Sequence, residues 1–193
     1  MAADRIDDVL ELHRRAAGHF GEKVLAVGPD QWHLPTPCSE WDVHQLVNHV
    51  VYENRWAVDL VAGATVAEVG DRHEGDLLGD DPVSAWHESL AAARDALDEP
   101  GVLDRTVHLS YGDETATEYF TQLVTDLVVH GWDLARAIGA DEEMDAELAG
   151  FVWQAWKDRE DMVRGSGMFG EHLDVPADAD TQTKLLALLG RRA

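Results

Sequence analysis

The stretch that decides the fold runs from Thr121 to Ile138, TQLVTDLVVHGWDLARAI. Read at helical period, it places five residues on one stripe, spaced four, three, four and four apart. These residues are Leu123, Leu127, His130, Leu134 and Ile138. His130 is thus in line with core-facing leucines, and Asp126 projects from the same side one turn earlier. A carboxylate and an imidazole at the margin of a core are costly to bury without a partner, and a metal ion is the simplest one.

The same periodicity predicts further helices on both sides of this stretch. With the opening stretch included, helices are expected at about 6–27, 41–61, 82–97, 117–138, 145–163 and 181–189. Within residues 102–115, apolar and polar residues instead alternate before a Gly-Asp turn, which favours a short hairpin or an extended crossover. We therefore expect an all-α fold, an up-and-down four-helix bundle with an extra short helix and a small hairpin, as a single domain over residues 1–193.

The segments between the helices carry their own signals. Residues 31–40, QWHLPTPCSE, predict an extended connector, because its two prolines forbid a helix. Ser39, followed three residues later by Asp42, indicates an approximate capping box at the start of the second helix. Cys38 is either a thiol activated near that helix start or a small buried side chain, and we favour the buried side chain. Residues 63–81 predict a flexible acidic loop without the ligand spacing of a calcium site.

Composition limits the partners that the protein can have. The 193 residues include 38 Asp+Glu against 15 Lys+Arg, a formal net charge of −23. Such a surface repels nucleic acid and anionic lipid, so we expect neither as a partner. No apolar run of about 18 residues is present, and the N-terminal stretch lacks the apolar region of a signal peptide. With a single cysteine as well, the chain is expected to be cytoplasmic.

A third candidate metal ligand lies on the second predicted helix. His49 sits beside the apolar stripe of that helix, and its alternative role is a core histidine bonded to a backbone carbonyl. Together with Asp126 and His130 it makes a three-ligand set, which leaves coordination positions open, as in catalytic metal sites. Zinc suits such a set, and so do nickel and iron. Glu53, one turn after His49, is a candidate fourth ligand or an acceptor for a ligating histidine. Its alternative, which we favour, is a solvated position or an ion pair with Arg55.

Two motifs carry a resemblance to a known family. PTPCSEWDVHQLVNHV at residues 35–50 and DLVVHGWDLARAIG at residues 126–139 resemble the DinB-like superfamily. More narrowly, the chain is similar to the metal-binding proteins related to the N-terminal domain of mycothiol-dependent maleylpyruvate isomerase. The ending VPADADTQTKLLALLGRR, residues 175–192, is similar to the closing segment of the stand-alone members. The resemblance implies a DinB-like four-helix bundle with additional elements, in agreement with the helical pattern.

The resemblance also implies a ligand set and a cofactor. In that family a histidine on the second helix and a Glu-x-x-x-His pair on a later helix hold a divalent metal, usually zinc, and the matching positions here are His49, Asp126 and His130. This chain has aspartate where the isomerase has glutamate, and the shorter arm is expected to shift the ion or to weaken its binding. Thiol-dependent members bind the sulfur of their cofactor at the open metal position, so mycothiol or another low-molecular-weight thiol is expected. The short tail shows no equivalent of the isomerase's C-terminal domain, so maleylpyruvate isomerisation itself is not expected.

Further polar residues are predicted to surround the metal. Asp133 is placed to accept a hydrogen bond from a ligating imidazole or to form a structural salt bridge, and Asn48 and Arg55 are weaker candidates for the pocket. The first hypothesis is a thiol-dependent transferase or isomerase that acts on a small-molecule thiol and an electrophilic substrate, with no catalytic residue assigned. The alternative is a non-catalytic metal-binding or ligand-sensing protein, and a third interpretation takes both histidines as core residues without metal. A homodimer is an option.

Overall fold

A computed structural model of the protein describes residues 3–159, 162 and 170–193. In chain order its elements are α1 (Ala3–Ala26), α2 (Val43–Val61), α3 (Val66–Val69), α4 (Pro82–Leu97), η1 (Val102–Asp104), β1 (Thr106–Leu109), β2 (Gly112–Thr115), α5 (Ala116–Ile138), α6 (Ala146–Trp156) and α8 (Thr181–Leu188). The chain divides into two compact units, Met1–Ala140 and Asp141–Ala193. That residues 1–193 act as one functional domain stays a prediction.

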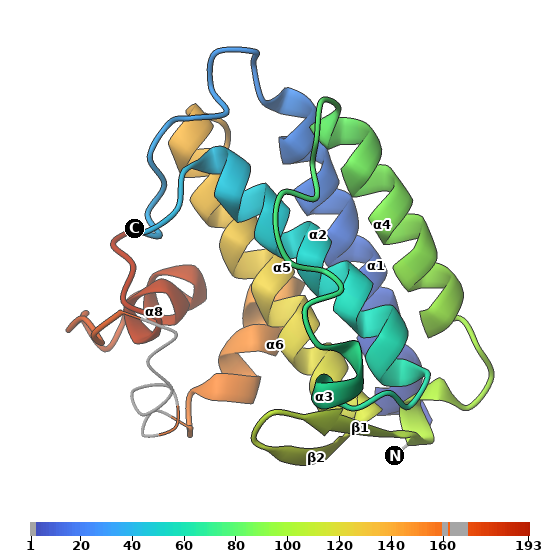
Figure 1. The fold of residues 1–193 in the computed structure, drawn as a ribbon. Coiled ribbons are helices and arrows are strands. Elements are labelled where there is room, and N and C mark those ends of the chain that lie inside the picture. Colours follow the sequence, from blue (N-terminus) through green and yellow to red (C-terminus); the bar gives the residue numbers. More distant parts are fainter. Residues whose placement is uncertain (1–2, 160–161, 163–169) are drawn as a thin grey trace. The chain divides into compact units, whose positions relative to one another are not determined.

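The first unit is a four-helix bundle (Figure 1). Helix α5 packs along α1 and α2, and α4 packs along the same two helices from the other side. The four helices therefore form a ring in the order α1, α5, α2, α4, with α1 and α2 diagonally opposed. Strands β1 and β2 pair in antiparallel register from Thr106 opposite Thr115 to Leu109 opposite Gly112. The predicted all-α four-helix bundle with a small hairpin is confirmed.

The core of this bundle is built from the apolar stripes that the sequence shows. On α5, Leu123, Leu127 and Leu134 are buried, whereas Ile138 at the end of the stripe is half-buried. The rings of Phe20 on α1 and Trp86 on α4 lie 4.9 Å apart, centre to centre. Helix α5 ends at a glycine with φ 71°, a left-handed conformation that glycine adopts without strain.

Helix α2 begins two residues later than the sequence predicts. Its N-cap is Asp42, whose side chain accepts from the backbone N–H of Gln45, while the Gln45 side chain accepts from the N–H of Asp42. Ser39 was the predicted capping residue, but the N–H of Trp41 is bonded to the carbonyl oxygen of Cys38 at 2.8 Å. Residues 38–41 are therefore held in a turn and cannot begin the helix.

The connection from α2 to α4, residues 62–81, runs back along α2. Arg72 Nη1 lies 2.8 Å from Asp59 Oδ1 near the end of α2, and the N–H of Leu77 bonds Asn48 Oδ1 nearer its start, at 2.7 Å. Helices α2 and α4 consequently point in the same direction (Figure 1). The sequence predicted a flexible loop here, and the structure instead shows the short helix α3 followed by a loop that side chains tie to α2.

In the second unit, α6 packs against α8. Asp145 caps α6 by accepting from two backbone N–H groups, and Asp180 caps α8 by accepting from the backbone N–H of Thr183. Helix α6 ends at Trp156, earlier than the predicted end at Val163, because Lys157, Asp158 and Arg159 offer no apolar side chain to bury. Of the last predicted residues, 160–163, only residue 162 lies within the described residues.

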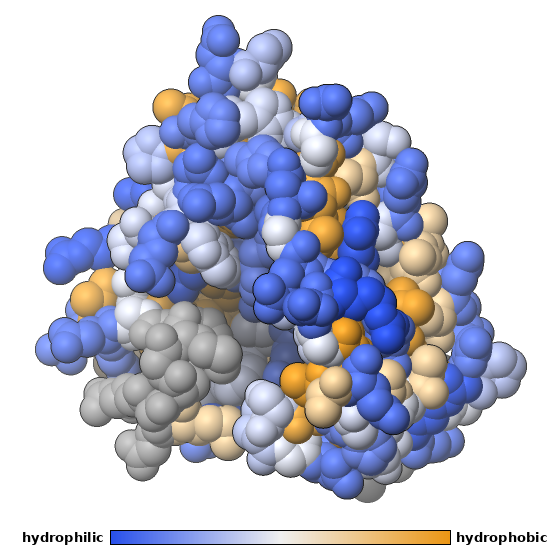
Figure 2. All heavy atoms as spheres, in the orientation of Figure 1, coloured by the Kyte–Doolittle hydropathy of each residue, from blue (hydrophilic) through white to orange (hydrophobic). Residues whose placement is uncertain are grey.

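The surface agrees with the acidic composition. The face drawn in Figure 2 is mostly hydrophilic, with small apolar patches scattered between polar side chains. Among the described residues, no helix combines the length and the apolar content that crossing a membrane requires.

Candidate metal centre

The structure brings the three predicted metal ligands together between α2 and α5. His49 Nε2 lies 2.9 Å from one carboxylate oxygen of Asp126, and His130 Nε2 lies 3.7 Å from the other. One ligand atom from each of the three residues lies within 4.8 Å of the others. The separation of four residues on α5 places Asp126 and His130 on one helix face, and α2 supplies His49 from across the interface.

A hydrogen bond on the side of the ring that faces away from Asp126 sets the orientation of His130. Its Nδ1 lies 3.0 Å from Oδ2 of Asp133, one turn later on α5, whose side chain is fully buried. An ionised carboxylate only accepts hydrogen bonds, so Nδ1 of His130 carries the ring proton and Nε2 presents its lone pair toward Asp126. A histidine held by a carboxylate in this way is oriented as metal-ligating histidines usually are. The donor set and its tautomer therefore fit a divalent metal.

The negative charges of the cluster shift the pKa of His49. Burial lowers this pKa, but the hydrogen bond and the negative charge of Asp126, helped by Glu53, outweigh burial and raise it above 6.5. Asp126 and His49 remain accessible, with side chains 30% and 22% exposed, whereas His130 is only 9% exposed. Solvent and small molecules can thus approach the cluster from the side of His49 and Asp126.

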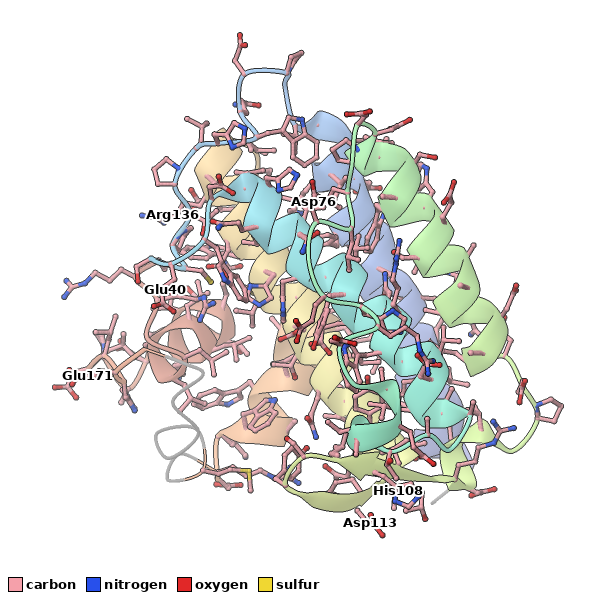
Figure 3. The ribbon with its side chains drawn as sticks, viewed as in Figure 1. Glu40, Asp76, His108, Asp113, Arg136 and Glu171 are labelled. Carbon is pink, nitrogen blue, oxygen red and sulfur yellow. The ribbon has the colours of Figure 1, made fainter. Side chains whose placement is uncertain are left out.

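A cavity of about 440 Å³ opens beside His49. Its aromatic walls are Trp41 and Tyr52, and Asp76 contributes a carboxylate from the loop along α2 (Figure 3). The Trp41 ring also lies 4.6 Å from the ring of His49 and 5.5 Å from that of His130, centre to centre. Trp41 thus covers both histidines and lines the adjoining cavity.

Asn48 shapes this cavity through the backbone of the loop. Its side-chain amide donates to the carbonyl oxygen of Gly75 at 3.1 Å, and its oxygen accepts from the N–H of Leu77 at 2.7 Å. Asn48 lines the cavity, as predicted for a pocket residue, but its polar atoms are engaged in holding the loop. Its contribution to the cavity is therefore the position of the 75–77 segment.

Two more ionisable groups face the cluster. Burial and the negative charge of Asp126 raise the pKa of Glu53 to about 7, against the opposing effect of His49. Burial, followed by the charges of Glu53 and Asp126, raises the pKa of Tyr119 well above its usual value. Among the described residues, the buried hydroxyl of Tyr119 has no hydrogen-bond partner. Glu53 is not one of the mutually close donor atoms, so the structure places it beside the three-ligand set and outside it.

Cys38 lies on the other side of His130. Its Sγ is 3.3 Å from Asp133 Oδ2 and 3.8 Å from His130 Nδ1, and the side chain is partly exposed. The loop that carries it is built around Thr36, whose hydroxyl accepts from the N–H of Cys38 and donates to the carbonyl of Trp41. The side chain is half-buried, with its thiol turned toward the buried Asp133, so the favoured expectation of a buried side chain is met only in part.

Arg55 is the predicted pocket residue that the structure does not bring to the cluster. Within the described part of the chain it makes no hydrogen bond or ion pair to the candidate ligands. Conversely, Cys38, Trp41 and Tyr119 belong to the neighbourhood of the cluster although the sequence did not single them out for it. Tyr119 precedes Asp126 by seven residues and therefore shares its helix face, which is the one signal that periodicity offered.

Comparison with protein families gives one match over most of the first unit. The family described as the mycothiol maleylpyruvate isomerase N-terminal domain matches residues 13–135. Two similar relatives are the uncharacterized proteins Rv0738 and MT0763 from two strains of Mycobacterium tuberculosis. Each is 31% identical over 190 residues, and the match covers 95% of this chain and 98% of the relative.

Solved structures with a similar fold include the mycothiol-dependent maleylpyruvate isomerase. The match has a TM-score of 0.61 at 16% identity and covers 76% of this chain and 67% of the isomerase chain. A histidine-to-alanine mutant of that enzyme gives a TM-score of 0.62 at 14% identity, over 77% of this chain and 66% of the mutant. At these identities the likeness shows a shared fold over about two thirds of the isomerase.

Proposed function

The chain belongs to the family of the mycothiol maleylpyruvate isomerase N-terminal domain, and we propose that it is a thiol-dependent metalloenzyme, a transferase or isomerase. The observation that carries the proposal is the convergence of His49, Asp126 and His130 beside an accessible cavity. These three residues would hold a divalent metal, with zinc first and nickel or iron as alternatives. When bound, such a metal supplies a positive charge that lowers the pKa of a coordinated thiol, so that the thiol is a nucleophile at neutral pH.

The side chains around the ligands have separate tasks in this proposal. Asp133 holds the proton on His130 Nδ1, which keeps Nε2 available. Trp41 lies against both histidine rings and shields them from bulk water. Glu53 is the candidate acceptor for the proton that the thiol gives up, because it lies next to the ligand set and burial keeps its pKa, about 7, near neutrality.

The lining of the cavity favours an uncharged, hydroxylated thiol such as mycothiol as the cofactor. Gln45 and Tyr52 offer groups that can both donate and accept hydrogen bonds, and Asp76 offers a carboxylate. Of the described residues that line this cavity, none is a lysine or an arginine, and His44 lies 3.6 Å from Asp76. Glutathione carries two carboxylates, which need cationic partners when they leave water, so it is the poorer fit. The second reactant is an electrophilic small molecule.

We also propose a localisation and a range of partners for the protein. A low-molecular-weight thiol cofactor points to the cytoplasm, and the net charge of −23 argues against nucleic acid and anionic membranes as partners. A homodimer is compatible with it.

A conjugation assay tests the proposal. Zinc-loaded protein is mixed with monobromobimane and either mycothiol or glutathione, and the rate of thiol conjugation is followed by fluorescence. We expect turnover with mycothiol, at least tenfold slower turnover with glutathione, and loss of turnover in His49→Ala. Glu53→Gln should lower the rate while leaving the zinc content unchanged. Zinc binding without turnover on any thiol would instead assign the chain to the alternative, a non-catalytic metal-binding or ligand-sensing protein.

A further inference from the structure

The side of His130 that faces away from Asp126 carries a second set of donor atoms. Cys38 Sγ, His130 Nδ1 and Asp133 Oδ2 lie 3.0, 3.3 and 3.8 Å apart in pairs. These atoms are a sulfur, a nitrogen and an oxygen, each a common zinc ligand, and they form a potential metal-holding group distinct from the first in two of its three residues. We propose that Cys38, His130 and Asp133 form a second, alternative cation position, selective for soft divalent metals such as cadmium and zinc.

The spacing of the three atoms supports this assignment. Tetrahedral zinc with bonds of about 2.0 to 2.3 Å to nitrogen, oxygen and sulfur holds its ligand atoms roughly 3.3 to 3.6 Å apart. Of the three separations in the structure, one lies below that range, one at its lower limit and one above it, so a cation fits between the side chains with shifts of a few tenths of an ångström. No displacement of a helix is needed.

The location of the group also supports it. Asp133 is fully buried, so its carboxylate stands in an environment that favours a positive counter-charge. Cys38 is partly exposed and gives a cation a path from solvent. Cys38 is the single cysteine of the chain, so its thiol cannot be consumed by an intrachain disulfide. The sulfur makes this position softer than the first one, which offers nitrogen and oxygen only.

His130 makes the two positions mutually exclusive. At the first position Nε2 binds the metal and Nδ1 keeps the ring proton, which it donates to Asp133. At the second position Nδ1 binds, the ring proton moves to Nε2, and that nitrogen faces Asp126 Oδ1 at 3.7 Å. The thiol of Cys38 loses its S–H proton to solvent when the sulfur binds, so one proton is released for each cation taken up. A single imidazole thus selects between two metal positions by its tautomer.

Cadmium titration followed by ultraviolet absorption tests the proposal, because a thiolate bound to cadmium gives a charge-transfer band. The decisive protein is His49→Ala, which removes a ligand of the first position only. We expect this variant to bind one cadmium with the thiolate band at full strength. Cys38→Ser should lose the band while still binding one zinc at the first position.

A variant of Asp133 distinguishes a three-ligand site from cadmium binding by the Cys38 thiol alone. In Asp133→Asn the affinity measured through the band should fall by roughly tenfold or more. His33→Ala is the matched control, since His33 lies on the same connector with its side chain 83% exposed, and it should titrate like the parent. Circular dichroism confirms that each variant is folded.

Three results would overturn the proposal. The first is a folded His49→Ala protein without the thiolate band at saturating cadmium. The second is an unchanged affinity in Asp133→Asn, which would show that the thiol binds cadmium alone. The third is two cadmium ions per chain in the parent, which would contradict exclusive use of His130.

Discussion

His130 Nδ1 lies 3.0 Å from Oδ2 of Asp133, a side chain with no exposure to solvent. This contact determines which nitrogen of His130 is free to bind a metal. It thereby makes the candidate metal centre depend on a buried residue of α5. An aspartate at this place is more than a structural partner, since removing its charge changes the ring's preferred tautomer.

Replacing Asp133 by asparagine should therefore weaken metal binding without removing a ligand of the first position. We expect the zinc affinity to fall about 10- to 100-fold, as measured by competition with a chromogenic chelator. The control is Asp113→Asn on the hairpin, where Asp113 pairs with His108 at 2.7 Å and both side chains are exposed (Figure 3). Equal zinc affinities in the two variants would contradict the orienting role of Asp133.

Asn48 should matter for the loop and not for the metal. In Asn48→Ala the two hydrogen bonds to residues 75–77 are lost, and the free energy of unfolding should fall by about 1 kcal/mol. Hydrogen exchange in residues 75–77 should accelerate, while the zinc content stays at the parent value. Gln122→Ala is the control, because its amide bonds Tyr111 on the hairpin, and it should leave exchange in this loop unchanged. Loop protection that survives in Asn48→Ala would refute this description.

The hydroxyl of Tyr119 is expected to serve a ligand and not the fold. It is buried without a hydrogen-bond partner among the described residues, so Tyr119→Phe should leave the free energy of unfolding unchanged or raise it by up to about 1 kcal/mol. The comparison is Tyr111→Phe, which removes a hydroxyl bonded to Gln122 and should not stabilise. Urea unfolding of both variants checks this. A loss of more than about 1 kcal/mol in Tyr119→Phe would show that the hydroxyl is satisfied in the fold.

His13 should make stability depend on pH. It is buried on α1 with its ring edge-on to Phe120, and burial, with the charges of Arg94 and Arg14, lowers its pKa from 6.5 to about 4. The unfolded chain therefore binds the proton more readily, so stability is complete above pH 6.5 and falls as the pH drops from 6.5 toward 4. The loss between pH 7 and pH 4 should be on the order of 2 to 3 kcal/mol.

The variant His13→Leu isolates this contribution from that of the carboxylates. Urea unfolding of parent and variant at pH 7 and pH 4 gives two differences, and the parent should lose more by the amount stated above. If both proteins lose the same free energy of unfolding, His13 does not titrate with a lowered pKa.

The parts of the fold that local sequence determines could be predicted. Helix α5 follows from the spacing of its leucines and ends at Gly139, as its left-handed C-cap requires. The meeting of Asp126 and His130 follows from their spacing on one helix, and that of His49 with them from the motif resemblance.

The rest depended on contacts between residues that are distant in the chain. Cys38 and Asp133 are 95 residues apart, and only the turn around Thr36 brings the thiol to α5. Asn48 meets Leu77 because the loop returns along α2, a path that no local pattern indicates. Nothing in the sequence around Arg55 indicates that its side chain lies away from the cluster.

The most direct measurement is the metal content of purified Cys38→Ser, which keeps the first position only, beside the same protein carrying in addition His49→Ala, His130→Ala or the control His33→Ala. Metal is measured by elemental analysis after incubation with zinc and removal of loosely bound ion. Cys38→Ser and its His33→Ala derivative should each hold one zinc per chain, whereas the His49→Ala and His130→Ala derivatives should hold less than a tenth of that amount. A Cys38→Ser protein that retains no metal, or His49→Ala and His130→Ala derivatives that retain as much as Cys38→Ser, would contradict a metal site at His49, Asp126 and His130.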